Sequence, residues 1–276
     1  MTISERNIYL KIGIAFCSVT TVLIIAASSI IIPIYPEMEE NVRRPGYLFQ
    51  AISGLFLGNN YYSVHVSLIL AVLFSLAATL LIYLFFERTS TPEILYVSFF
   101  TVSFSFEIIR LMPPLHFIYN FSSFYLLGAS RILLFFRYFS IFSLFTASVC
   151  AAGLEVQKIR NIILIMITAV LLVIFGVPID TQTWDTSFVM IYDYSSLLKM
   201  IETVAFITTA ITFFIAAKVR DSKEYIYVGV GVILALIGRN ILLGTDNWAG
   251  PIPGILLLSF GTWFICSKLH KMHLWL

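Results

Sequence analysis

The sequence predicts an all-α protein: a polytopic membrane helical bundle of about eight transmembrane helices with both termini in the cytoplasm. Composition, long apolar segments and the placement of basic residues lead to this prediction. Of the 276 residues, 59% are hydrophobic and only 12% are charged, whereas soluble domains carry about 25% charged residues. Because too little polar surface remains to cover a water-soluble globule, we expect residues 1–276 to form a single transmembrane domain.

The apolar segments are long and continuous, which favours helices over the strands of a membrane barrel. A spanning helix needs about 20 mostly apolar residues, whereas barrel strands alternate apolar and polar residues over about ten positions. The first segment exceeds the ~7–15 apolar residues of a signal peptide, so we interpret it as an uncleaved span. The predicted spans are 12–34, 64–86, 94–112, 124–150, 161–178, 200–217, 225–243 and 251–267.

Basic residues between the spans predict the orientation, because cytoplasmic loops are enriched in Lys and Arg. With the N-terminus inside, the cytoplasmic segments contain Arg6, Lys11, Arg88, Lys158, Arg160, Lys218, Arg220, Lys223, Lys268 and Lys271. The outer segments contain only Arg43, Arg44 and Lys199. The short loops and the absence of an organelle signal favour the cell membrane, in particular a bacterial cytoplasmic membrane.

The longest loop, about 35–63, contains apolar residues at helical spacing between Leu48 and Phe56. Two interpretations remain open for this segment. It forms a short helix lying at the outer interface, or an ordered loop that closes the mouth of the bundle.

Several classes of function lack their sequence signals. The net charge is only +2, and no basic stripe favours nucleic acid as a partner. Cys17, Cys150 and Cys266 are isolated in apolar segments, and no Cys/His spacing typical of a metal site is present. No phosphate-binding loop or catalytic motif is found. We therefore predict no metal, no cofactor and no assigned catalytic residue.

Six charged residues fall inside the predicted spans. Each costs at least ~2.5–3.5 kcal/mol at the membrane centre unless it is paired or hydrated, so we expect them to face the bundle interior. Arg137 lies about 20 Å along its helix from Phe124, which makes it the deepest and the one most readily explained as structural. The six are Glu107, Arg110, Arg131, Arg137, Glu202 and Arg239.

Helical spacing predicts that some of these charges share a cavity open to the outer side. Ser103, Glu107 and Arg110 follow at i, i+4 and i+7, on one face of an α-helix. A stripe of small residues, Gly231, Ala235 and Gly238, permits close helix approach and should hold the adjacent Arg239 rigidly. The predicted ligand-binding residues are Glu107, Arg110, Arg131, Glu202, Arg239 and His116.

Four intramembrane arginines against two glutamates predict an anionic partner, because guanidinium groups suit carboxylates and phosphates. The favoured interpretation is a sensor or receptor-like module whose outward-facing pocket takes an anionic small molecule or lipid headgroup. Without a cytoplasmic output domain, it would need a membrane protein partner beside the lipid bilayer.

Three alternatives stay open. A transporter of a small anion is one, although the proline-rich helix breakers lie at the outer ends and the deep half of the bundle looks apolar. An intramembrane enzyme acting on lipid is another, with Glu107 and either His65 or His116 as acid and base. The third is a membrane scaffold or assembly factor in which the charges form internal ion pairs that fix helix register.

Overall fold

The computed structural model describes residues 3–35, 60–87, 92–153, 159–178, 184–185, 187–192, 194–244 and 246–274. The predicted interfacial segment Leu48–Phe56 lies outside the described residues, as do Arg43, Arg44, Arg88 and Lys158. The helical elements are α1 (Ile3–Ile31), η1 (Ile32–Ile34), α4 (Tyr61–Phe86), α5 (Pro92–Ser103), η2 (Phe104–Leu111), α6 (Met112–Tyr119), α7 (Ser123–Ala151), α8 (Ile159–Phe175), α9 (Ser195–Val219), α10 (Glu224–Gly244) and α11 (Pro251–Leu274).

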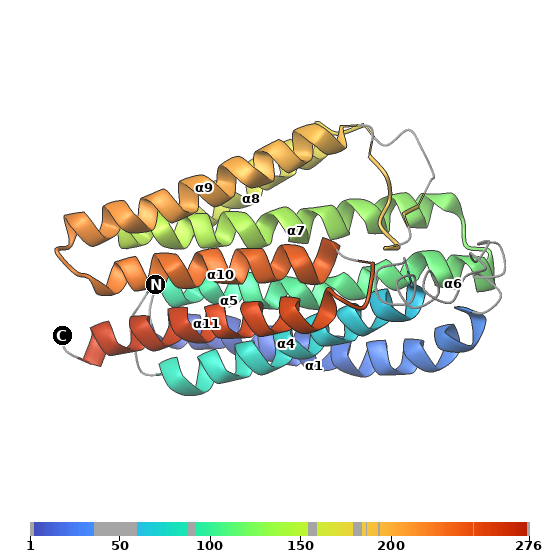
Figure 1. The fold of residues 1–276 in the computed structure, drawn as a ribbon, viewed down its shortest axis with the longest axis horizontal. Coiled ribbons are helices and arrows are strands. Elements are labelled where there is room, and N and C mark those ends of the chain that lie inside the picture. The colour runs from blue at the N-terminus through green and yellow to red at the C-terminus, as the bar shows by residue number, and fades with distance from the viewer. Residues whose placement is uncertain are drawn as a thin grey trace, which may run out of the picture.

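The helices run along the long axis of an elongated bundle, and both chain termini lie at the same end (Figure 1). Near the N-terminus, Arg6 donates a hydrogen bond to the Phe86 carbonyl at the end of α4. Near the C-terminus, the His270 ring packs edge-on against Phe86 with the ring centroids 5.4 Å apart. We call this the terminal end, and we call the opposite end, which contains residues 184–192, the cavity end.

Within the described residues, seven helices are long and apolar enough to cross a membrane. This confirms the predicted all-helical class and is compatible with a multi-pass membrane protein. Large apolar side chains also point outward, such as Leu172 on α8, which is 71% exposed. The seven candidate spans are Ser4–Ile31, Tyr61–Phe86, Pro92–Tyr119, Ser123–Ala151, Ser195–Val219, Glu224–Gly244 and Pro251–Met272.

The predicted span 161–178 corresponds to α8, which has 17 residues and is the shortest of these apolar helices. At 1.5 Å per residue it is about 25 Å long, slightly less than the ~30 Å hydrocarbon core of a bilayer. α8 packs against α7. The number of eight spans therefore stays a prediction.

The helical run Pro92–Tyr119 changes its winding in the middle, where η2 is a 3-10 helix. Pro113 and Pro114 have no N–H to donate to carbonyls four residues earlier, and their rings crowd those carbonyls. The Met112 N–H bonds the Ile109 carbonyl three residues back instead. The proline pair thus favours the tighter winding of the residues before it.

This winding decides which side chains of η2 share a face. A 3-10 helix has three residues per turn, so Phe104, Glu107 and Arg110 are aligned, and all three are buried. Ser103 was expected on the same face as the two charged residues, but its hydroxyl donates to the Phe99 carbonyl of its own helix at 2.7 Å. The 3-10 register therefore aligns the charged pair without Ser103.

Glycines bring α10 and α11 into direct backbone contact, as the small-residue stripe predicted. Gly231 and Gly238 are seven residues apart on α10, and Gly254 and Gly261 are seven apart on α11, so each pair lies on one helix face. A Cβ on Gly254 would lie 2.7 Å from the Leu242 amide nitrogen. The two helices can approach this closely only because these positions lack side chains.

Between α8 and α9, the described residues 184–185 and 187–192 form a short hairpin at the cavity end. Trp184 and Met190 form an isolated antiparallel bridge, and the Asp185 N–H donates to the Val189 carbonyl at 2.9 Å. At the turn, Phe188 adopts a left-handed backbone with φ of 57°. Its ring stacks on Tyr61 with the centroids 5.4 Å apart, which anchors this segment to α4.

We predict that Gly238→Ala lowers the thermal unfolding midpoint of the detergent-purified chain, because the added methyl overlaps the Leu258 backbone nitrogen. Overpacking of this kind costs about 1–3 kcal/mol. Gly128→Ala on α7 is the matched control, because no atom lies within 4 Å of the new methyl; it should leave the midpoint unchanged or raise it. Equal midpoints for the two variants would contradict the close packing.

A candidate ligand site in a charged cavity

A cavity of ≈730 Å³ lies at the cavity end between α7, α9, α10 and residues 184–192. It exists because α10 does not reach as far toward the cavity end as α7 does. α10 ends at Gly244, whereas the N-terminal part of α7 continues beyond that point (Figure 1). The charged residues of its wall are Arg137, Asp185, Lys199, Glu202 and Arg239. Apolar residues of the same wall include Leu133, Leu134, Ile141, Leu198, Phe206 and Leu243.

The innermost charge pair joins η2 to α7. Arg137 donates from Nε to Glu107 Oε1 and from Nη2 to Oε2, each at 2.8 Å. Such a two-pronged bond fixes both the distance and the rotation of the two groups. The Glu107 side chain is only 3% exposed and the Arg137 side chain is 18% exposed. Arg137 therefore presents its remaining surface to the cavity while Glu107 lies behind it.

Arg110 connects this pair to the segment that covers the cavity end. Its Nη1 lies 3.7 Å from Glu107 Oε2, and its Nε donates to the Ser187 carbonyl at 2.8 Å. Nη2 donates to the same carbonyl. The buried guanidinium of Arg110 thus holds the hairpin against η2. The negative end of the Ser187 carbonyl dipole partly stabilises the positive charge of Arg110.

Arg239 makes the second pair and bridges three helices. Its Nη1 bonds Glu202 Oε1 on α9 and, at 2.9 Å, the Asn240 side-chain oxygen. Its Nη2 donates to the Arg137 carbonyl at 2.9 Å, and its Nε donates to the Ser140 hydroxyl at 3.2 Å. Because α10 ends five residues beyond Arg239, this side chain near a helix end meets the middle of α7.

These five residues, Glu107, Arg110, Arg137, Glu202 and Arg239, form a charge network with three positive and two negative groups. The net charge of the network is therefore +1, taking all groups as ionised. At the cavity wall, the exposed Lys199 and Asp185 add one charge of each sign. The wall thus combines charged groups that have a single positive surplus with apolar side chains.

Two tyrosines help to place the helices around the cavity through neutral hydrogen bonds. The Tyr138 hydroxyl of α7 donates to the Leu198 carbonyl of α9 at 2.8 Å. The Tyr192 hydroxyl donates to the Ser130 carbonyl at 3.2 Å. Burial raises the pKa of Tyr192, so its hydroxyl keeps its proton and remains a donor at neutral pH.

The six predicted ligand-binding residues have different places in the structure. Glu202 and Arg239 line the cavity, and Glu107 and Arg110 contact residues that line it. Arg131 does not line the cavity, because it points to the α8 side, with its guanidinium carbon 5.5 Å from the centre of the Phe175 ring. His116 on α6 also lies outside the cavity lining.

Sequence reasoning treated Arg137 as structural, yet it forms part of the cavity wall. The signal was available: Leu133, Leu134, Arg137, Tyr138 and Ile141 follow the spacing of one helix face, and all five line the cavity. Lys199, Glu202, Thr203 and Phe206 have the same spacing on α9. Nothing in the sequence indicated that Ser187 would contribute a carbonyl.

His65, which the sequence allowed as a cavity residue, belongs to a separate buried chain of hydrogen bonds. Ser28 donates to the Ile24 carbonyl at 2.6 Å, so its oxygen accepts from His65 Nε2 at 2.7 Å. In a neutral ring, Nδ1 then accepts from the Tyr35 hydroxyl at 2.8 Å. Burial raises the pKa of Tyr35, which keeps it a donor, and His65 is fully engaged away from Glu107.

No protein-family model, no curated protein and no solved structure matches this chain.

We predict that Glu107→Gln is more destabilising than Glu202→Gln. Glu107 is buried and serves Arg137 and Arg110, and removing one partner of a buried pair costs about 3–5 kcal/mol. The Glu202 side chain is 25% exposed, so water replaces part of what is lost. Arg131→Ala, which removes only a ring contact, should cost about 0.5–1 kcal/mol. Thermal unfolding of the three detergent-purified variants measures this order.

A double variant, Glu107→Gln with Arg137→Met, tests whether the loss of stability in Glu107→Gln comes from leaving Arg137 unpaired. It should recover part of the stability lost in Glu107→Gln, because the unpaired guanidinium is removed together with its partner. Additive losses from the two substitutions would contradict a direct coupling between the residues.

Proposed function

We propose that this chain is a sensor or receptor-like membrane module that crosses the bilayer eight times and binds a small anionic ligand in the charged cavity. In this proposal α8 is the eighth span, the cavity end faces outward, and both termini lie in the cytoplasm of a bacterial cell. The placement of Lys and Arg along the sequence supports this orientation.

The observation that carries the proposal is the composition of the cavity wall. Its volume falls within the ~300–1,000 Å³ typical of small-molecule pockets. Arg137, Lys199 and Arg239 line the same wall as apolar residues such as Leu133, Ile141 and Phe206. The single positive surplus of the network matches the charge of one carboxylate, and guanidinium groups also suit phosphate. The apolar residues of the wall suit a hydrocarbon or aromatic group attached to the anion.

The network also offers a route from ligand binding to a change in helix positions. Arg239 contacts Glu202 on α9 and the Arg137 carbonyl on α7. An anion that competes with Glu202 for Arg239 would loosen α9 from α10 while adding a new bond to α10. A ligand shifts such an equilibrium only by its difference in affinity for the two arrangements. A membrane protein partner would read the change.

One observation favours a scaffold instead. Arg110, Arg137 and Arg239 each have a carboxylate neighbour. Arg110 and Arg239 also donate to backbone carbonyls of the bundle. Ion pairs of this kind fix helix register without any ligand. A scaffold would therefore keep its function when the cavity is filled.

We predict that Thr203→Trp abolishes ligand binding, whereas Thr208→Trp leaves it intact. Both threonines are exposed on α9 and bond their own helix backbone, but only Thr203 lines the cavity. The two variants and the parent chain are purified in native-lipid particles. Bound small molecules are identified by mass spectrometry, and binding of octanoate, benzoate and phenyl phosphate is measured by thermal shift.

Lys199→Ala extends the test to charge. Lys199 is exposed at the wall, so its loss should weaken anion binding several-fold without lowering stability, and Lys218→Ala at the terminal end should change neither. An anion lost only in the cavity variants supports the proposal, and a phospholipid as the lost species assigns the headgroup as ligand. No bound species and no thermal shift in any variant overturns it and favours the scaffold. Uptake of the bound anion into proteoliposomes would identify a transporter, and its chemical conversion an enzyme.

A further inference from the structure

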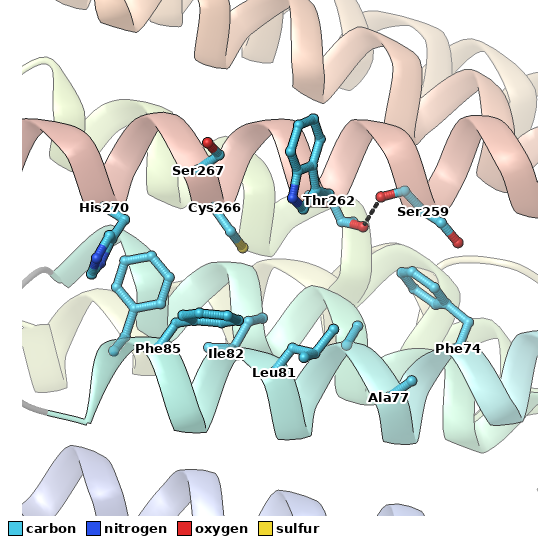
Figure 2. Close-up of a pocket in the computed structure, with 13 residues that line it drawn as sticks. Phe74, Ala77, Leu81, Ile82, Phe85, Ser259, Thr262, Cys266, Ser267 and His270 are labelled. Carbon is cyan, nitrogen blue, oxygen red and sulfur yellow. Dashed lines mark hydrogen bonds between the residues drawn. The ribbon is translucent and has the colours of Figure 1, made fainter.

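A second, apolar groove lies between α4 and α11, in the half of the bundle toward the terminal end (Figure 2). Its volume is ≈310 Å³. Small side chains on both helices, among them Ala77, Ala78 and Ser259, create it where larger residues would close the gap. Trp263, at 62% exposed, and Phe85, at 63% exposed, stand at its sides. Apolar rims exposed to this degree suit contact with hydrocarbon rather than with water.

The length of the groove matches one leaflet of a bilayer. On α4 it runs from Phe74, near the middle of the helix, to Phe86 at its last turn. Twelve residues of α-helix span about 18 Å, and one leaflet contributes about 15 Å to the hydrocarbon core. The groove therefore begins near the membrane midplane and ends near one interface if the bundle spans the bilayer as its helices allow.

Its cross-section is too small for a helix. A helix with its side chains is about 10–12 Å wide, so a stretch of about 18 Å would need far more than the ≈310 Å³ of the groove. A cavity of about 150 Å³ takes up a benzene ring, so this groove has room for roughly a dozen carbon atoms. A single flexible hydrocarbon chain fits these dimensions.

The end of the groove nearest the interface has a polar atom without a partner. His270 lines the groove there, and its Nδ1 is buried without a hydrogen-bond partner among the described residues. The ring is held edge-on to Phe86. Nδ1 itself is closed to a ligand, but Ser267 and His270 end the apolar lining with polar side chains. The ester and phosphate region of a lipid lies at this depth, beside the hydrocarbon core.

From these four observations we infer that the α4–α11 groove is a binding site for one acyl chain of a phospholipid from the leaflet at the terminal end. The chain methyl lies toward Phe74 and Ser259, and the glycerol and headgroup region lies beside His270. The inference rests on the membrane-spanning bundle and not on a ligand in the charged cavity.

Photo-crosslinking tests the site. The full chain is reconstituted in phosphatidylcholine vesicles that contain a minor fraction of phosphatidylcholine with a diazirine at the middle of one acyl chain. After irradiation, adducts are mapped by mass spectrometry. Adducts should be several-fold denser on groove residues such as Thr262 and Cys266 than on Leu164 and Leu172, which are exposed on α8.

Ala78→Phe fills the groove and should remove these adducts, and Ala169→Phe on α8 is the matched control that should keep them. If Ala78→Phe does not fold, Ser259→Leu fills the groove from the α11 side. Equal labelling of the groove and α8 would mean ordinary solvation by lipid and would overturn the site. Labelling that persists in the filled variants would overturn it as well. No small anion is added, so the result is independent of the charged cavity.

Discussion

The paired bond between Glu107 and Arg137 is the constraint on which the cavity end depends. A carboxylate that is only 3% exposed is unfavourable in an apolar bundle unless a cation meets both of its oxygens. Satisfying it fixes η2 against α7, and this brings Arg110 to the hairpin and the Arg137 carbonyl to Arg239. Two further contacts therefore follow from one buried charge, and they join η2, α7, α10 and the hairpin into one arrangement.

The two prolines after η2 give this constraint its geometry. In an α-helix, Glu107 and Arg110 would be rotated by about 60° from alignment, whereas in a 3-10 helix they are eclipsed. Pro113 and Pro114 remove two α-helical donors, and the tighter winding upstream compensates for one of them. The proline pair is a sequence feature typical of a helix end, yet helical residues lie on both sides of it. Its effect is to align Glu107 and Arg110 on the preceding turns.

The helices and much of the charge network could be predicted from the sequence. How far along the bundle axis each charged residue lies could not. Apolar runs predict spans because hydrocarbon penalises polar residues, and Gly231 and Gly238 predict a close helix contact because any side chain there would separate the backbones. Helical geometry separates Arg131 from Arg137 by about 120°, so only one faces the cavity. The spacing of Arg137 with Leu133, Leu134 and Ile141 on one helix face indicates which one. No residue pattern encodes how far α10 extends along α7. The Ser187 carbonyl is a backbone group and has no side-chain signal at all.

The cavity and the groove lie in opposite halves of the bundle, yet they share the α10–α11 pair. Gly238, Gly254 and Gly261 bring these helices into backbone contact, so they resist sliding and behave as one body. Arg239 on α10 contributes to the cavity wall, and Cys266 on α11 contributes to the groove wall. A ligand that displaces Glu202 from Arg239 acts on one side of this body, and an acyl chain acts on the other. Coupling between the two sites then requires only that the pair have two positions relative to α7 and α4, with each occupant favouring one of them.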